Sequence, residues 1–205
     1  MVAVPLFALC FATYDLAPWL PAMLIWWSKP WLDRTLLFVL SRALFGVATT
    51  PPDVWEVQRD VWWAQWLETL TLRRLSASRS FTQPVRQLEG LTGTARGTRI
   101  RQLAARHRGV ARAMTQAFAV AEIALVLSLI SLGLWLAPKH ADTSWAGILV
   151  GAAKPQTVAL TLCYAAAVAF AEPFYVAAGF GMYLNRRVEL EAWDIEQEFR
   201  RAFPG

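Results

Sequence analysis

Hydrophobic and polar positions divide the chain into two long apolar runs, a mixed N-terminal run, and amphipathic segments between and after them. Residues 116–138, QAFAVAEIALVLSLISLGLWLAP, contain one charged residue in 23 positions. Residues 156–184, QTVALTLCYAAAVAFAEPFYVAAGFGMYL, also contain one. Because about 20 apolar residues of helix cross ~30 Å of hydrocarbon, both runs predict transmembrane helices.

The N-terminal region, residues 1–27, is apolar but is interrupted by Asp15, Pro18 and Pro21. It forms either one kinked span or a hairpin that turns at Asp15, since membrane helices tolerate proline where neighbours satisfy the freed carbonyls. We therefore expect an all-α fold: a polytopic α-helical membrane protein of three or four spans with amphipathic interfacial helices.

Composition supports this class. Of 205 residues, 56% are hydrophobic and 17% are charged, and the mean hydropathy is +0.35. Soluble domains average about 25% charged residues. The chain is therefore expected to be embedded in a membrane.

Basic residues near the spans predict the orientation, because cytoplasmic loops carry an excess of Lys and Arg. The loop at 139–155 contains two, Lys139 and Lys154. The segments that flank the runs on the other side contain nine: Lys29, Arg34, Arg42, Arg96, Arg99, Arg101, Arg106, Arg108 and Arg112. We expect residues 28–115 and 188–205 in the cytoplasm of a bacterium, the two spans of 116–187 in its inner membrane, and loop 139–155 outside.

The cytoplasmic region 28–115 contains two tryptophan-rich amphipathic stretches, WWSKPWLDRTLLFVLSRALFG and DVWEVQRDVWWAQWLETLTLRRL. In the second, Trp62, Trp66 and Leu70 recur at helical spacing. Tryptophan favours the headgroup layer, so these stretches predict helices that lie in the interface or re-enter it. The alternative is that the tryptophans pack against the spans.

The stretch from Gly90 to Met114 contains six arginines and no acidic residue. Each basic side chain near an anionic leaflet contributes ~1 kcal/mol of attraction, and this stretch is tethered beside the membrane. We therefore expect it to contact anionic lipid and not nucleic acid. The predicted lipid-facing residues are Arg96, Arg99, Arg101, Arg106, Arg108 and Arg112.

Catalytic and metal-binding patterns are not found in the sequence. His107 and His140 have no second ligand at metal spacing, and Cys10 and Cys163 lie in apolar runs, as buried hydrophobic residues do. The glycines of GLTGTARGTR lack the Gly-Lys-Ser/Thr ending of a phosphate-binding loop. We expect no enzyme activity, no cofactor and no metal.

Three carboxylates fall at membrane depth: Asp15, Glu122 and Glu172. Such residues cost about 2.5–3.5 kcal/mol at the bilayer centre on insertion scales, so each is a candidate functional residue. Glu122 is near the inner end of its run and is expected to reach the interface or pair with Arg108 or Arg112.

Glu172 lies deeper, beside Pro173, which cannot donate a hydrogen bond to the carbonyl of Ala169. Its carboxyl has three interpretations: a structural pair or protonated acid bonded to a neighbouring helix, a substrate or proton site, or a contact with a partner.

The C-terminal region 188–205 predicts an amphipathic helix whose polar face is acidic. The region contains five acidic residues and two arginines, which gives a net charge of −3 before the terminal carboxylate. Anionic lipid repels such a face, so its apolar stripe is expected to pack on protein, either on residues 91–112 or on a partner. The alternative is a solvated tail. The predicted surface is Val188, Ala192, Ile195, Phe199 and Phe203.

Three blocks, KPWLDRTLLFVLSRALFG, RRLSASRSFTQPVRQLEG and EPFYVAAGFGMYLNRRVELEAWDIEQEFRR, resemble a family of bacterial polytopic inner-membrane proteins of uncharacterised function. The family's genes lie near those for MoxR-type ATPases and von Willebrand factor A-like proteins. The resemblance covers most of the chain and implies a membrane partner of an ATPase-linked assembly. Because relatives carry a further N-terminal stretch, we expect a truncated or mis-started N-terminus here, with an incomplete first span.

Two functions fit these observations. The first is a non-enzymatic membrane scaffold or accessory subunit of an envelope-associated, ATPase-linked assembly, with a MoxR-type ATPase complex or a neighbouring membrane protein as partner. The alternative is a small transporter or channel component with Glu172 on the pathway. Short length and the lack of a repeated pair of broken helices favour the scaffold.

Overall fold

The computed structural model of the protein describes residues 17, 19–57, 76, 78–105, 107–137 and 154–202. Every regular element in these ranges is an α-helix, which confirms the all-α prediction for the described part of the chain. The helices are α2 (Leu20–Leu44), α3 (Pro51–Glu56), α5 (Arg79–Gln87), α6 (Gly93–Ala104), α7 (Arg108–Leu136) and α9 (Lys154–Ala202).

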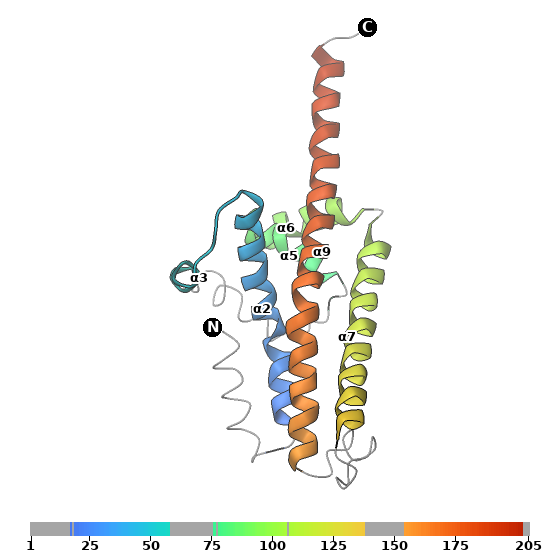
Figure 1. Ribbon diagram of the computed structural model, residues 1–205. Helices are drawn as coiled ribbons and strands as arrows, with labels where there is room; N and C mark the ends of the chain where they lie inside the picture. The colour runs from blue at the N-terminus through green and yellow to red at the C-terminus, as the bar shows by residue number, and fades with distance from the viewer. Residues whose placement is uncertain are drawn as a thin grey trace.

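The three long helices α2, α7 and α9 run side by side and form a bundle (Figure 1). Helix α9 packs against both of the others and against α5, so it is the central element. The short helices α5 and α6 gather around α9 at the end of the bundle where α7 begins (Figure 1). Beyond them α9 continues alone.

Two of these helices are long and apolar enough to cross a membrane: α7, and residues 155–192 of α9. Apolar side chains of α7 remain mostly exposed, including Val120, Ile123 and Trp135. An apolar helix face that no protein covers is what contact with lipid requires. The other predicted spans fall within residues 1–27, of which 1–16 and 18 lie outside the described residues.

Helix α2 includes the last residues of region 1–27 and the first residues of region 28–115. It runs along α9, where Ile25 packs against Ala165 and Val168. Ser28 and Asp33 of this helix are buried inside the bundle. Asp33 pairs with Arg79 of α5, whereas Ser28 donates to the backbone carbonyl of Ile25 within α2, so both polar side chains face protein.

A larger hydrophobic core joins α5 and α6 to the bundle through Leu37, Phe81, Leu103, Phe180 and Tyr183, among others. Within this core, α5 lies directly on α9 at Gly179. A Cβ atom built there would be 2.4 Å from Ser80 Cβ and 2.7 Å from the Ser80 backbone carbon. The missing side chain of Gly179 is what allows this close approach.

Asp53, in the first turn of helix α3, contacts the end of α2. The backbone N–H of Thr50 donates to Asp53 Oδ2 at 2.9 Å, and this bond lowers the pKa of the Asp53 carboxyl. Arg42 of α2 lies 3.7 Å from the same oxygen. The second tryptophan-rich stretch, with Trp62, Trp66 and Leu70, lies mostly outside the described residues.

Candidate functional site

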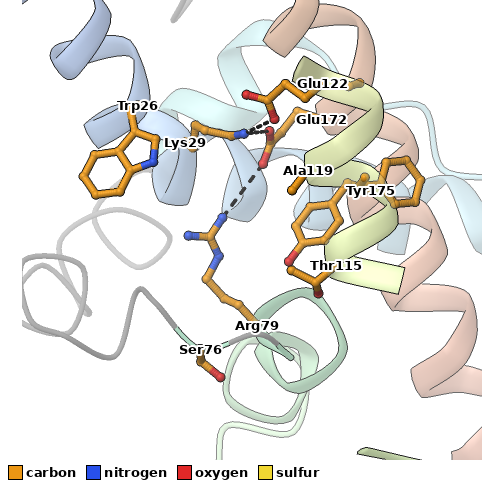
Figure 2. A pocket seen from close by; sticks show the side chains of 11 residues that line it. Trp26, Lys29, Ser76, Arg79, Thr115, Ala119, Glu122, Glu172 and Tyr175 are labelled. Atoms are coloured by element: carbon orange, nitrogen blue, oxygen red, sulfur yellow. Dashed lines mark hydrogen bonds and ion pairs between the residues drawn. The ribbon is translucent and has the colours of Figure 1, made fainter. Parts of the chain in front are cut away.

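Ionisable side chains from four helices meet inside the bundle, a group that we call the Glu172 cluster. Its members are Lys29 and Asp33 of α2, Arg79 of α5, Glu122 of α7 and Glu172 of α9. Figure 2 shows four of them, all but Asp33, converging from their separate helices. Glu122 and Glu172 both lie within the candidate membrane spans.

Lys29 bridges the carboxylates of α7 and α9. Its Nζ donates to Glu122 Oε2 at 2.6 Å and lies 3.0 Å from Glu172 Oε2 (Figure 2). The three side chains are 15%, 16% and 4% exposed, respectively. Charge pairs shielded from water in this way interact more strongly than surface pairs.

Arg79 binds the other side of the cluster, from the first residue of α5. Its Nη2 donates to Asp33 Oδ2 in a short contact, and the same nitrogen lies 3.8 Å from Glu172 Oε1. Glu172 therefore lies between two cations, Lys29 on one side and Arg79 on the other (Figure 2).

A cavity of ≈ 250 Å³ opens against these groups. Thr115, Phe118 and Tyr175 line it together with Trp26, so its walls are partly aromatic and partly polar. A polar cavity needs only about 10–15 Å³ of probe-occupied volume for each water molecule. The cavity therefore has room for several waters or for a small polar ligand.

Three buried polar atoms of the cluster have no hydrogen-bond partner among the described residues. They are Asp33 Oδ1, Glu172 Oε1 and Arg79 Nε. The cluster also joins three carboxylates to only two cations. It is thus neither fully hydrogen-bonded nor charge-balanced by the described side chains.

A second polar site, which we call the Glu89 clamp, lies farther along α9 and consists of Glu89, Arg99 and Tyr183. Arg99 Nε donates to Glu89 Oε2 at 3.0 Å, and the Tyr183 hydroxyl donates to Glu89 Oε1 at 2.6 Å. Arg99 Nη2 also donates to Oε1, at 3.2 Å. Both oxygens of Glu89 thus accept hydrogen bonds, and the clamp fastens the α5–α6 segment to α9.

The structure brings together two of the three carboxylates predicted at membrane depth, Glu122 and Glu172. Glu122 pairs with Lys29. It does not pair with Arg108 or Arg112, the partners that the sequence had suggested. Those two arginines are exposed. Asp15 lies outside the described residues.

The arginines predicted to face lipid differ in their exposure. Arg101, Arg108 and Arg112 are exposed, Arg96 is partly buried, and Arg99 is held in the Glu89 clamp. Arg106 lies outside the described residues.

On the predicted partner surface, Val188 and Ala192 are exposed. Ile195 and Phe199 lie in the helical part of α9, at positions where only the backbone is described, and Phe203 lies outside the described residues. The expected stripe therefore begins on an uncovered face of α9.

Three members of the Glu172 cluster were not predicted as site residues: Lys29, Asp33 and Arg79. A signal was present for two of them, because Lys29 and Asp33 are four residues apart and so share one helix face. Arg79 lies in RRLSASRSF, which has no pattern that marks it. Among the described residues, no group of three or more His, Cys, Asp or Glu is placed to hold a metal ion.

Comparisons with known proteins do not add a functional assignment. The chain matches no family model, no curated protein and no solved structure.

Proposed function

We propose that the chain is a non-enzymatic scaffold or accessory subunit of the bacterial inner membrane, with its C-terminus in the cytoplasm. The observation that carries this proposal is the length of α9, a single helix of 49 residues. At 1.5 Å per residue such a helix is about 73 Å long, more than twice the ~30 Å hydrocarbon thickness. One rigid element thus connects the bundle to a point well beyond it (Figure 1).

The projecting part, residues 185–202, is here called the α9 extension. Its described ion pairs are internal: Arg186 pairs with Glu189 and Arg187 with Glu191. Leu190 still packs against the core, whereas Val188 is 64% exposed. The first residues of the extension therefore contact the core through Leu190, whereas Val188 lies on an apolar face that the described residues leave uncovered.

The chemistry of the extension suggests the kind of partner. An acidic helix with an apolar stripe fits an apolar groove with basic residues at its rim, in the helix-in-groove mode of recognition. The family resemblance implies an ATPase-linked assembly, so we propose a MoxR-type ATPase complex or a neighbouring membrane protein as the occupant. Anionic lipid is disfavoured because the net charge of residues 188–205 is negative.

A paired substitution in the extension tests this role. Replacing Ile195 and Phe199 with Ser removes the centre of the stripe, and we expect at least tenfold less ATPase partner to co-purify from cross-linked native membranes. The control is Gln197→Ser with Arg201→Ser, which has the same spacing on the opposite helix face and should retain the partner. Equal recovery from both variants and wild type would contradict the scaffold proposal.

The cavity beside Glu172 favours a second candidate, a small transporter or channel component. Its support is the combination of ≈ 250 Å³ of space with ionisable groups at membrane depth. In this role Glu172 lies on the pathway. Reconstituted liposomes distinguish the two roles, because a pathway predicts flux that Glu172→Gln alters and the scaffold predicts no flux above that of empty liposomes.

A further inference from the structure

The charges of the Glu172 cluster do not cancel. Lys29 and Arg79 supply two positive charges, whereas Asp33, Glu122 and Glu172 supply three negative ones when all are ionised. Asp33 is 0% exposed and the Glu172 side chain 4%. An excess buried charge is costly unless something neutralises it.

The hydrogen bonds show where the excess resides. Lys29 pairs with Glu122 and with one oxygen of Glu172, and Arg79 donates to one oxygen of Asp33. The oxygens left over, Asp33 Oδ1 and Glu172 Oε1, have no donor among the described residues. Each belongs to a carboxyl that contacts the same nitrogen of Arg79.

The two carboxyls also lie near each other, since Asp33 Oδ2 and Glu172 Oε1 both lie within 3.8 Å of Arg79 Nη2. Two ionised carboxylates offer only acceptors, and like charges so near each other disfavour double ionisation. One added proton converts an acceptor into a donor and removes the excess charge. Aspartic proteases provide a precedent, because two neighbouring carboxyl groups there share one proton.

We infer that Asp33 and Glu172 form a proton-binding site and share one proton inside the bundle. The cluster then contains two cations, two carboxylates and one carboxylic acid, and it is neutral. The inference goes beyond the proposed scaffold role and does not depend on it.

Every helix packed around the pair contributes a charged or titratable group. These groups are Lys29 from α2, Arg79 from α5, Glu122 from α7, and Tyr164 and Tyr175 from α9. The cavity borders Glu172 directly and has room for water beside it. Arg79 is the first residue of α5 and contacts both carboxyls. The bound proton therefore lowers the negative charge on Asp33 of α2 and Glu172 of α9 that attracts α5.

The inference is tested by infrared spectroscopy of the full chain in lipid nanodiscs at neutral pH. We expect the C=O stretch of a protonated carboxylic acid, and we expect it to disappear in Glu172→Gln and, independently, in Asp33→Asn. In each variant two carboxylates remain for two cations, so no proton is needed. Glu191→Gln, the same substitution on an exposed part of α9, should leave the band unchanged.

Three outcomes would overturn the inference. Wild type without the band at neutral pH shows that the pair is ionised. A band that persists in both variants places the proton on another group. A band lost in only one of the two folded variants assigns the proton to a single carboxyl and refutes sharing.

Discussion

The two parts of α9 differ in whether their polar side chains bind other helices or α9 itself. From Lys154 to Leu184 the polar contacts of this helix reach other elements: Glu172 contacts Lys29 and Arg79, and Tyr183 contacts Glu89. In the α9 extension the described ion pairs join Arg186 and Arg187 to acids one turn later on the same helix. The described polar side chains of the inner part thus bind other parts of the fold, whereas those of the α9 extension bind one another.

The difference predicts where substitutions will damage the fold. In the inner part, a lost polar group leaves a buried partner without its charge or its hydrogen bond. In the extension, a lost group leaves a partner that water can solvate. Stability should therefore depend on the inner part, and recognition on the extension.

Removal of Arg79 should have the largest effect on stability. Arg79→Met leaves Asp33 buried and unpaired and takes one cation from Glu172, so we expect a loss of ~3–5 kcal/mol in unfolding free energy. Thermal unfolding in nanodiscs measures the change. Arg101→Met, at an exposed position, should stay within about 0.5 kcal/mol of wild type; similar values for both variants would show that the Glu172 cluster is not structural.

Closing the space between α5 and α9 should have a smaller effect. Gly179→Ala places a Cβ against Ser80, and we expect a loss of ~1–3 kcal/mol from overpacking. Gly181→Ala is the matched control, because nothing lies within 4 Å of its Cβ position. That variant should be neutral or more stable, since alanine favours helix. Equal effects at the two glycines would contradict the close packing of α5.

The extension should show the smallest effect. Glu191→Gln removes the i,i+4 pair with Arg187, whose two side chains are 45% and 52% exposed. Such pairs contribute about 0.3–0.5 kcal/mol, so the melting temperature of the bundle should barely change. A loss as large as that of Gly179→Ala would show that the extension is part of the folded core.

The sequence allowed prediction of the all-α class and of the helices around 116–138 and 156–184, because length and apolar composition are local properties. It did not allow prediction of the Glu172 cluster. Lys29 reaches Glu122 across 93 positions, and Arg79 reaches Asp33 across 46. Such pairs depend on how α2 and α5 pack on α9, and no short-range pattern encodes that packing.

Pairing of Glu122 with Arg108 or Arg112, one of the two arrangements expected for it, is not found, for the same reason. Arg108 and Arg112 are near it along the chain, but they lie on exposed faces of α7, whereas Glu122 faces the bundle. Lys29 was counted only for its charge and its nearness to a span. Its position one turn before Asp33 was the available sign of a shared inward face.

The proposed role requires that the α9 extension leave the membrane on the cytoplasmic side. A paired reporter fusion after Gly205, with one enzyme active only in the cytoplasm and one active only outside it, measures this directly in intact cells. We predict activity of the cytoplasmic reporter alone, because nine basic residues flank the spans on that side and two on the other. Activity of the external reporter at Gly205 would reverse the orientation and contradict the scaffold proposal.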